Sequence, residues 1–353
     1  MEEQVDIKIF KAKEVRDWLW HNRPLEGYSN RILSPDRANA ILHNPYILDD
    51  DPIASAVFED DKMVACTAAF PDLISGQKVW WFTTLWCHPD CRGKGYALIA
   101  VGCLAEEYGE GNYFDMWGAA ETVEIFKFLG LKNTFVSEYI FEQKNIVKDT
   151  FKGKLLYHYE NWKAANRLRR SGIKKKVTLT KYRLMYTSFI DDNTYSFIQD
   201  HREKDLWQRE QPMLNWIMEY SYRHWAPLYG RDYWTGYFAG KSSRFWKSGV
   251  KIFVDGKLQG YYYISDSDRS LSIKYLYYNE KYEEQVFASI AEHIIKLKNN
   301  NFSTRDPRLA QYISGSKIFW NEREERISFS YPESFNIIKD AVSQGGDGDG
   351  FGG

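Results

Sequence analysis

A strand, a glycine-bearing loop and a helix follow one another in residues 85–97, LWCHPDCRGKGYA, and this stretch decides the fold. Residues 79–87 are rich in Trp, Phe and Thr, which predicts a strand. The residues from about 96 to 108 have the pattern of an amphipathic helix. Between them, Gly93 and Gly95 allow close backbone approach, and the N–H groups at a helix start favour an anion. The stretch therefore predicts a phosphate-binding loop.

Two cationic side chains, Arg92 and Lys94, lie in this loop and would add full charge at its rim. The glycine spacing differs from that of the phosphate loop of nucleoside triphosphatases. The loop by itself therefore indicates an anion but does not name the ligand.

The loop resembles the pyrophosphate-binding motif of the GNAT acyltransferase family, Arg/Gln-x-x-Gly-x-Gly/Ala, which is matched by Arg92, Gly95 and Ala97. Downstream, FKFLGL at residues 126–131 is similar to a helix ending of the same family. The element order expected over residues 5–143 agrees with that family's fold. The resemblance implies an α/β (α+β) acyl-CoA N-acyltransferase fold with a mixed, largely antiparallel central sheet.

The resemblance also implies a coenzyme site, with acetyl-CoA or another acyl-CoA as co-substrate. The loop backbone would hold the pyrophosphate, and the pantetheine arm would lie along the edge of the fourth strand, where it diverges from the fifth. The implied binding residues are Leu85, Trp86, Cys87, Arg92, Gly93, Lys94, Gly95, Tyr96 and Ala97. The aromatic residues of this strand could instead be plain core packing. Successive side chains of a strand point to opposite faces, so only one face of this strand can serve a cleft.

The catalytic residues are less clear, because the family's usual tyrosine acid is replaced here by Phe126, which has no proton to give. The nearest carboxylates are Asp115 on the predicted fifth strand and Glu121 at the start of the next helix. Either is a candidate general base, and either could instead be a solvated or capping residue. Weaker candidates are Asp72, Glu59 and the thiol of Cys87.

The second half of the chain repeats the pattern of the first. Residues 58–65 line up with residues 253–260 at a constant offset of 195, and both carry a charged hairpin turn between aromatic-rich strands. This predicts two tandem copies of the fold. The predicted division is a GNAT acyl-CoA-binding domain at 1–150, a basic connecting segment at 151–177, a degenerate GNAT-like domain at 178–343 and a flexible Gly/Asp tail at 344–353.

The second copy lacks the features of a coenzyme loop. Its corresponding turn, residues 278–284, has three carboxylates and no glycine, and would repel a pyrophosphate. Its aromatic cluster could line an acceptor cleft or pack the two halves together. The cluster consists of Trp207, Trp216, Tyr220, Tyr222, Trp225, Tyr229, Tyr233, Trp234 and Tyr237.

Composition excludes several classes of protein. The net charge is −1, with 44% hydrophobic and 27% charged residues, which is typical of a soluble globular protein. The four cysteines form no C-x-x-C pair, so we expect neither a disulfide scaffold nor a metal site. The start of the chain lacks the features of a signal peptide, and no apolar run is long enough to cross a membrane. We therefore expect a cytoplasmic protein.

Residues 151–183 hold eleven lysine and arginine residues and one glutamate. A solvated connecting helix, a basic wall over a phosphorylated ligand and an RNA contact all agree with this charge. Nothing else in the sequence indicates nucleic acid, and oligomeric state is not indicated at all.

The sequence therefore favours an acyl-CoA-dependent N-acyltransferase that acts on a small-molecule or peptide amine by direct attack in a ternary complex. Two alternatives remain. One is an aminoacyl-tRNA-dependent transferase of tandem GNAT-like build, which the basic segment favours and the intact loop opposes. The other is a non-catalytic acyl-CoA-binding or sensor protein, which the missing tyrosine favours.

Overall fold

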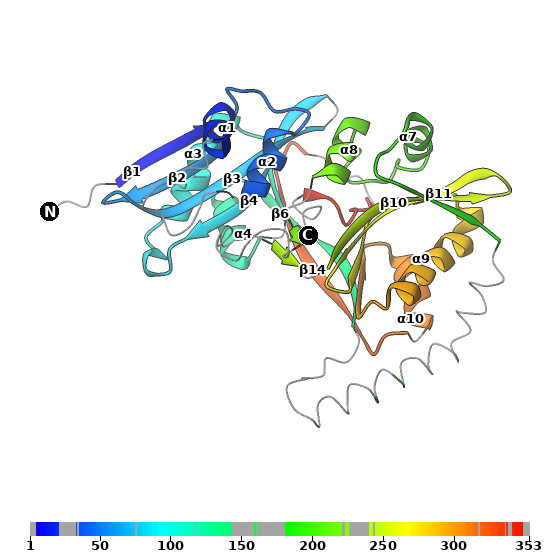
Figure 1. Cartoon of the computed structure of the whole chain (residues 1–353). Helices are drawn as coiled ribbons and strands as arrows, with labels where there is room; N and C mark the ends of the chain where they lie inside the picture. Colours follow the sequence, from blue (N-terminus) through cyan, green and yellow to red (C-terminus); the bar gives the residue numbers. More distant parts are fainter. Residues whose placement is uncertain are drawn as a thin grey trace.

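The computed structural model describes residues 5–20, 33, 35–74, 76–116, 118–142, 159, 162, 181–220, 223–225, 240–242, 244–316, 318–335, 337 and 341–348. The described residues form an α/β fold around one mixed, largely antiparallel sheet of twelve strands (Figure 1). This confirms the predicted fold class.

The described residues of the first half form six strands and four α-helices. The strands are β1 (Val5–Lys11), β2 (Pro52–Glu59), β3 (Lys62–Ile74), β4 (Gln77–Cys87), β5 (Tyr113–Met116) and β6 (Lys132–Glu142). The helices are α1 (Ala12–Trp20), α2 (Pro35–Leu42), α3 (Tyr96–Tyr108) and α4 (Ala120–Phe128), with a short 3-10 turn η1 (Pro89–Cys91). These bounds lie close to those predicted from hydrophobic periodicity and from the Gly and Pro residues that end helices and strands.

The second half repeats this order with one extra strand pair. Its sheet strands are β7 (Arg183–Thr187), β10 (Phe245–Val254), β11 (Lys257–Ser267), β12 (Ser270–Tyr278), β13 (Asn301–Thr304) and β14 (Asn321–Tyr331). Its helices are α7 (Asp192–Gln199), α8 (Gln211–Glu219), α9 (Glu283–Leu297) and α10 (Pro307–Ser316), with the 3-10 turn η3 (Glu280–Tyr282). The separate pair consists of β8 (Arg223–Trp225) and β9 (Gly240–Ser242).

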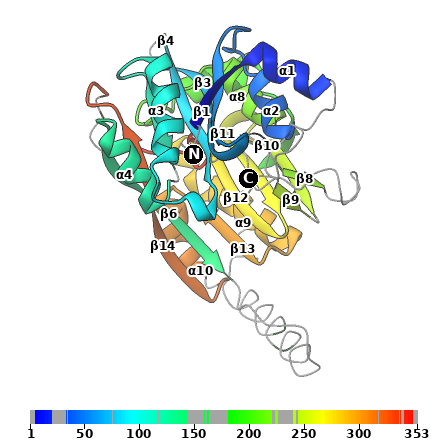
Figure 2. The same cartoon turned by 90° about the vertical axis from the view of Figure 1, so that its left-hand side faces the viewer.

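The two halves share one sheet because they exchange strands. The strand order is β1-β2-β3-β4-β5-β14-β6-β13-β12-β11-β10-β7. Strand β14, from the second half, lies between β5 and β6 of the first half, and β6 in turn pairs with β13 of the second. The sheet therefore continues across the boundary that the sequence predicts between the domains (Figures 1 and 2).

The two hairpins that revealed the repeat have the same geometry. Phe58 pairs with Met63 in the first half, and Phe253 pairs with Leu258 in the second, each next to a register shift one residue earlier. Both turns contain residues with positive φ, such as Asp60 at 50° and Asp255 at 50°. Equal register and equal irregularity at an offset of 195 support the predicted duplication.

Different elements pack on the two faces of the sheet in the first half. Trp80 stacks on Tyr108 of α3 with ring centroids 4.2 Å apart. The neighbouring Trp81 points to the other face, where it meets Trp207 at 4.4 Å. Trp216 of α8 donates from Nε1 to the carbonyl of Ala40 in α2, at 2.7 Å. The predicted cluster members Trp207 and Trp216 are therefore packing residues that join the halves.

The aromatic residues Tyr222, Tyr229, Tyr233, Trp234 and Tyr237 of that cluster lie outside the described residues, as does almost all of the predicted basic segment. Within the described chain, no helix is long and apolar enough to cross a membrane.

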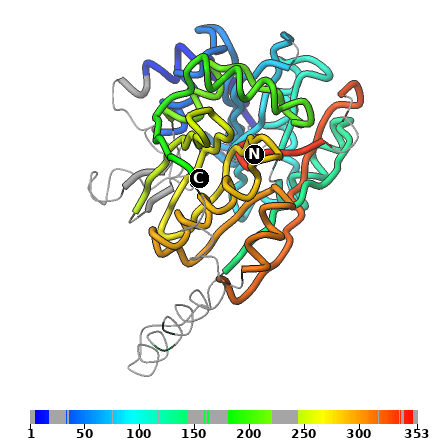
Figure 3. Tube along the Cα trace, turned by 90° about the vertical axis from the view of Figure 1, so that its right-hand side faces the viewer, coloured from blue at the N-terminus to red at the C-terminus, as the bar shows by residue number. Residues whose placement is uncertain are grey.

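Residues 344–348, which the sequence assigns to a flexible Gly/Asp tail, are packed against the rest of the described chain. Gln344 is 8% exposed and Asp347 is fully buried. The amide of Gly346 donates to the carbonyl of Lys274 at 2.8 Å. The segment lies between the two halves rather than on the outside (Figures 1 and 3). Glycine is used here for close backbone contact, which composition cannot distinguish from flexibility. Residues 349–353 lie outside the described residues.

Candidate functional site

The predicted phosphate loop has the backbone shape that its glycines suggest. Gly93 has φ +86° and Gly95, the N-cap of α3, has φ +85°, so both occupy the left-handed region that favours glycine. A Cβ atom at either position would meet nothing within 4 Å. The glycines are therefore needed for their backbone conformation, and the space beside them is open.

The amide groups of this loop are available to a ligand. Within the described chain, the N–H groups of Gly93, Gly95 and Ala97 make no hydrogen bond, and the first turn of α3 has no acidic residue. Arg92 is exposed, and no described residue pairs with its guanidinium. The loop and helix start therefore form a cationic surface with free donors, which suits a phosphate or pyrophosphate.

Lys94 is held differently from Arg92. Its Nζ lies 2.9 Å from Oε1 of Glu59, at the end of β2, and the Tyr96 hydroxyl donates to the same carboxylate. These two hydrogen bonds lower the pKa of the Glu59 carboxyl. Glu59 therefore ties the loop to the end of β2, and its carboxylate balances part of the Lys94 charge. The sequence does not predict this contact, although Glu59 lies in the first of the two hairpins that match at an offset of 195.

Strands β4 and β5 diverge beside the loop. They pair in parallel only at Trp80↔Tyr113 and Trp81↔Phe114, whereas β4 continues to Cys87. The edge of β4 beyond Trp81 therefore has no partner on β5. The predicted residues Leu85, Trp86 and Cys87 lie on this part of the strand, and Arg92 to Ala97 follow it.

The divergence coincides with a bulge in β4. The register with β3 shifts between Cys66 and Ala68, opposite Thr84. Thr84 has φ +53°, which is strained for a β-branched residue, and its buried hydroxyl has no hydrogen-bond partner in the described chain. Sequence reasoning missed Thr84, because a threonine inside an aromatic strand carries no signal of backbone strain.

The two predicted catalytic carboxylates lie in different environments. Asp115 is 6% exposed at the end of β5, and a Cβ on Gly118 would lie 2.6 Å from its Oδ2, so the carboxylate lies against that glycine. Glu121 is exposed in the first turn of α4. Only Asp115 is on a strand that borders the divergence.

The remaining candidates have other roles or unfavourable chemistry. Asp72 is 1% exposed and pairs with Arg209, whose Nε lies 2.8 Å from Oδ2. Burial raises the pKa of the Cys87 thiol, which disfavours the nucleophilic thiolate. Phe126 is buried against Phe82, with ring centroids 5.1 Å apart. In the described chain no cluster of three or more His, Cys, Asp or Glu residues could hold a metal ion.

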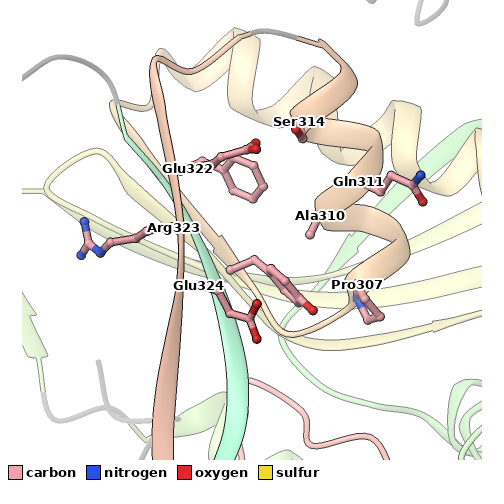
Figure 4. A pocket seen from close by; sticks show the side chains of 9 residues that line it. Pro307, Ala310, Gln311, Ser314, Glu322, Arg323 and Glu324 are labelled. Carbon is pink, nitrogen blue, oxygen red and sulfur yellow. The ribbon is translucent and has the colours of Figure 1, made fainter.

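A groove of about 420 Å³ lies elsewhere, between α10 and the paired strands β6 of the first half and β14 of the second (Figure 4). Tyr139 and Phe141 of β6 line it, Glu322 and Glu324 come from β14, and Arg323 points away from α10. It contains none of the predicted site residues.

Comparison with known proteins agrees with this geometry. Residues 12–122 match the model of the acetyltransferase (GNAT) family. The matched residues include the loop and both diverging strands. No curated protein matches the chain.

Several solved structures are similar to this chain at low sequence identity. A conserved protein of unknown function from Enterococcus faecalis V583, named as a probable N-acyltransferase, is 11% identical with a TM-score of 0.50, over 96% of this chain and 74% of that one. A GCN5-related N-acetyltransferase from Kribbella flavida is 12% identical with a TM-score of 0.48, over 93% and 71%. A tandem GNAT protein from the clavulanic acid biosynthesis pathway is 8% identical with a TM-score of 0.46, over 93% and 98%.

Proposed function

We propose that the first half transfers an acyl group, in the first instance acetyl, from acyl-CoA to the amine of a small molecule or peptide in the cytoplasm. The observation that carries this proposal is the divergence of β4 and β5 next to the free amides at the start of α3. A strand edge and a phosphate-binding helix start, side by side, suit a ligand that is an extended chain with a pyrophosphate at one end.

The binding roles follow from the geometry. The amides of Gly93, Gly95 and Ala97 would donate to the pyrophosphate, with Arg92 supplying a full charge beside them. The unpaired edge of β4 would hydrogen-bond the pantetheine amides. Acyl-CoA supplies a thioester, which is reactive toward amines without a metal ion.

The reaction forms one C–N bond and breaks one C–S bond. A neutral amine is required, so a base must first take a proton from the ammonium group. We assign this to Asp115, because it borders the divergence and Glu121 does not. A backbone N–H of the β4 edge would stabilise the developing oxyanion. Phe126 stands where a tyrosine would supply a proton. The leaving thiolate therefore takes its proton from solvent, or takes the proton that the attacking nitrogen releases once the C–N bond has formed.

The activity is tested with purified full-length protein, acetyl-CoA and a panel of amines, by following release of free thiol. We expect turnover with at least one amine. Tight acyl-CoA binding without turnover on any amine would favour the sensor alternative. Failure to bind acyl-CoA would overturn the proposal and return attention to an aminoacyl-tRNA donor.

The base assignment is tested with two matched variants, Asp115→Asn and Glu121→Gln. Removing a general base typically lowers kcat about 10²–10⁴-fold. We expect Asp115→Asn to show such a loss with little change in KM, and Glu121→Gln to stay within about twofold of wild type. A large loss in Glu121→Gln alone would transfer the role to Glu121.

A further inference from the structure

Each half of the molecule contains a divergence between its fourth and fifth strands. In the first half β4 and β5 separate after Trp81. In the second half β12 and β13 pair in parallel from Ser270 to Ser272 and then separate. Each divergence lies next to a bulge in the fourth strand. In the first half the bulge is in β4 opposite Thr67 of β3, and in the second half it is at Lys274 of β12. The two openings are thus equivalent places in a repeated fold.

The opening in the second half is occupied by residues 341–348, which we call the glycine segment. On the β12 side, Gly346 N donates to Lys274 O at 2.8 Å, and Leu276 N donates to the side-chain Oε1 of Gln344 at 3.2 Å. On the β13 side, Arg305 donates from Nη1 to Gln344 O at 2.8 Å. The segment therefore satisfies one main-chain acceptor and one main-chain donor on the part of β12 that β13 leaves free.

The contact surface accepts only glycine at two positions. A Cβ on Gly345 would lie 2.3 Å from the backbone oxygen of Ile273, and one on Gly346 would lie 2.4 Å from the ring of Tyr275. Neither neighbour can retreat easily, since one is backbone and the other is a buried ring only 2% exposed. The fit is therefore specific to a Gly-Gly sequence.

Charge fixes the end of the segment. The Asp347 carboxylate accepts from Gln344 N at 2.7 Å and from the Ser343 hydroxyl at 3.2 Å, which closes a turn. Arg209 donates from Nη1 to Gly346 O at 2.8 Å and lies 3.5 Å from the Asp347 carboxylate. A buried cation thus recognises both the backbone and the acidic side chain.

We propose that the divergence of β12 and β13 is a peptide-binding site whose ligand is the chain's own glycine segment, with Gln-Gly-Gly-Asp as the recognised sequence. The segment occupies in the second half the place that is open in the first. While it is bound, this half cannot admit another extended ligand. The proposal does not depend on the reaction proposed for the first half.

The proposal is tested by amide hydrogen exchange on the full-length chain. In wild type the amides of Gly346 and Leu276 should exchange at least 100-fold more slowly than in an unstructured peptide. In Gly345→Ala both should exchange at least tenfold faster than in wild type, because the Cβ expels the segment. The control is Gly315→Ala, whose Cβ meets nothing within 4 Å and which should leave both rates unchanged. Unprotected amides in wild type, or full protection in Gly345→Ala, would overturn the proposal.

A second measurement uses a chain that ends at Val342, together with a synthetic peptide of residues 343–353. Leu276 should lose protection in the shortened chain and regain it when the peptide is added, whereas a peptide with Gly345→Ala should not restore it. Protection that is unchanged by shortening would contradict the proposal. If the shortened chain does not fold, as judged by circular dichroism, the full-length Gly345→Ala result decides.

Discussion

The two halves share a fold but differ at the divergence between their fourth and fifth strands. In the first half the loop before α3 carries two glycines with positive φ and no acid in the first helical turn. In the second half α9 follows η3 directly and begins with Glu283 and Glu284, which already complement its partial positive charge. The first opening keeps its donors free, while the second is filled by the glycine segment. The two halves therefore share a frame and differ in what lies in the equivalent opening.

The largest expected effect concerns Arg209, which connects the filled opening to the first half through Asp72. Arg209→Met leaves the buried Asp72 without its ion-pair partner and removes one of the two cations that act on the buried Asp347. Loss of one partner of a buried pair costs about 3–5 kcal/mol. We expect a fall of this size in the free energy of unfolding, measured by urea denaturation.

The matched control is Arg308→Met, since Arg308 is 50% exposed and pairs with Glu280 and Glu283 at 3.1 Å. An exposed pair contributes less than about 1 kcal/mol. Equal losses in both variants would mean that the buried network does not join the halves.

An intermediate effect is expected for Gly95→Glu, which removes the feature that most distinguishes the first half. The variant strains the backbone at φ +85° and places a negative charge beside the free amides. We expect acyl-CoA affinity, measured by titration calorimetry, to fall at least about 100-fold, or about 2.7 kcal/mol.

Gly76→Glu is the control, because Gly76 has φ +81° and equally open surroundings in the turn before β4. It should lose similar stability and keep its affinity. Unchanged binding by Gly95→Glu would remove the coenzyme loop from the proposal.

The smallest expected effect is a pH dependence from Asp205, which accepts from Tyr277 and from Gln344 of the glycine segment. Burial raises the pKa of Asp205 to about 7, with Asp347 adding to the rise and Arg202 opposing it. The native state therefore holds this proton over a range in which the unfolded chain, with a pKa of about 3.9, has lost it. This contribution to stability is complete below about pH 4 and is lost as pH rises toward 7.

Asp205→Asn removes this titration. We expect the variant to flatten the decline of stability between pH 4 and pH 7, measured by urea denaturation at several pH values. A wild-type protein whose stability rises over this range, with an unchanged slope in the variant, would contradict the assignment.

Much of the fold was predictable because its signals are local. Gly95 and Gly109 flank α3, and Asp191 caps α7 by accepting from Thr194 N, so these helix bounds follow from short stretches of sequence. The loop of the candidate site was predictable for the same reason, since Arg92, Gly93 and Gly95 lie within four residues of one another.

Features set by distant parts of the chain could not be predicted. Nothing in the sequence of β14 shows that it pairs with β5 and β6, because its partners come from the other half. The glycine segment has the composition of a flexible linker, and only the buried surface of β12 shows why Gly345 must lack a side chain. The strain at Thr84 likewise depends on register with β3, which no local pattern encodes.

The exchange of β14 also sets the order in which the protein can be completed during synthesis. When Glu142 has emerged from the ribosome, β5 and β6 lack the strand that lies between them, and each presents an open edge. That strand ends at Tyr331, so at about 5–20 residues per second the nascent first half waits roughly 10–40 seconds for it. The candidate catalytic strand β5 therefore gains its second neighbour only after β14 has been translated, and termination before Tyr331 would leave an incomplete, aggregation-prone sheet.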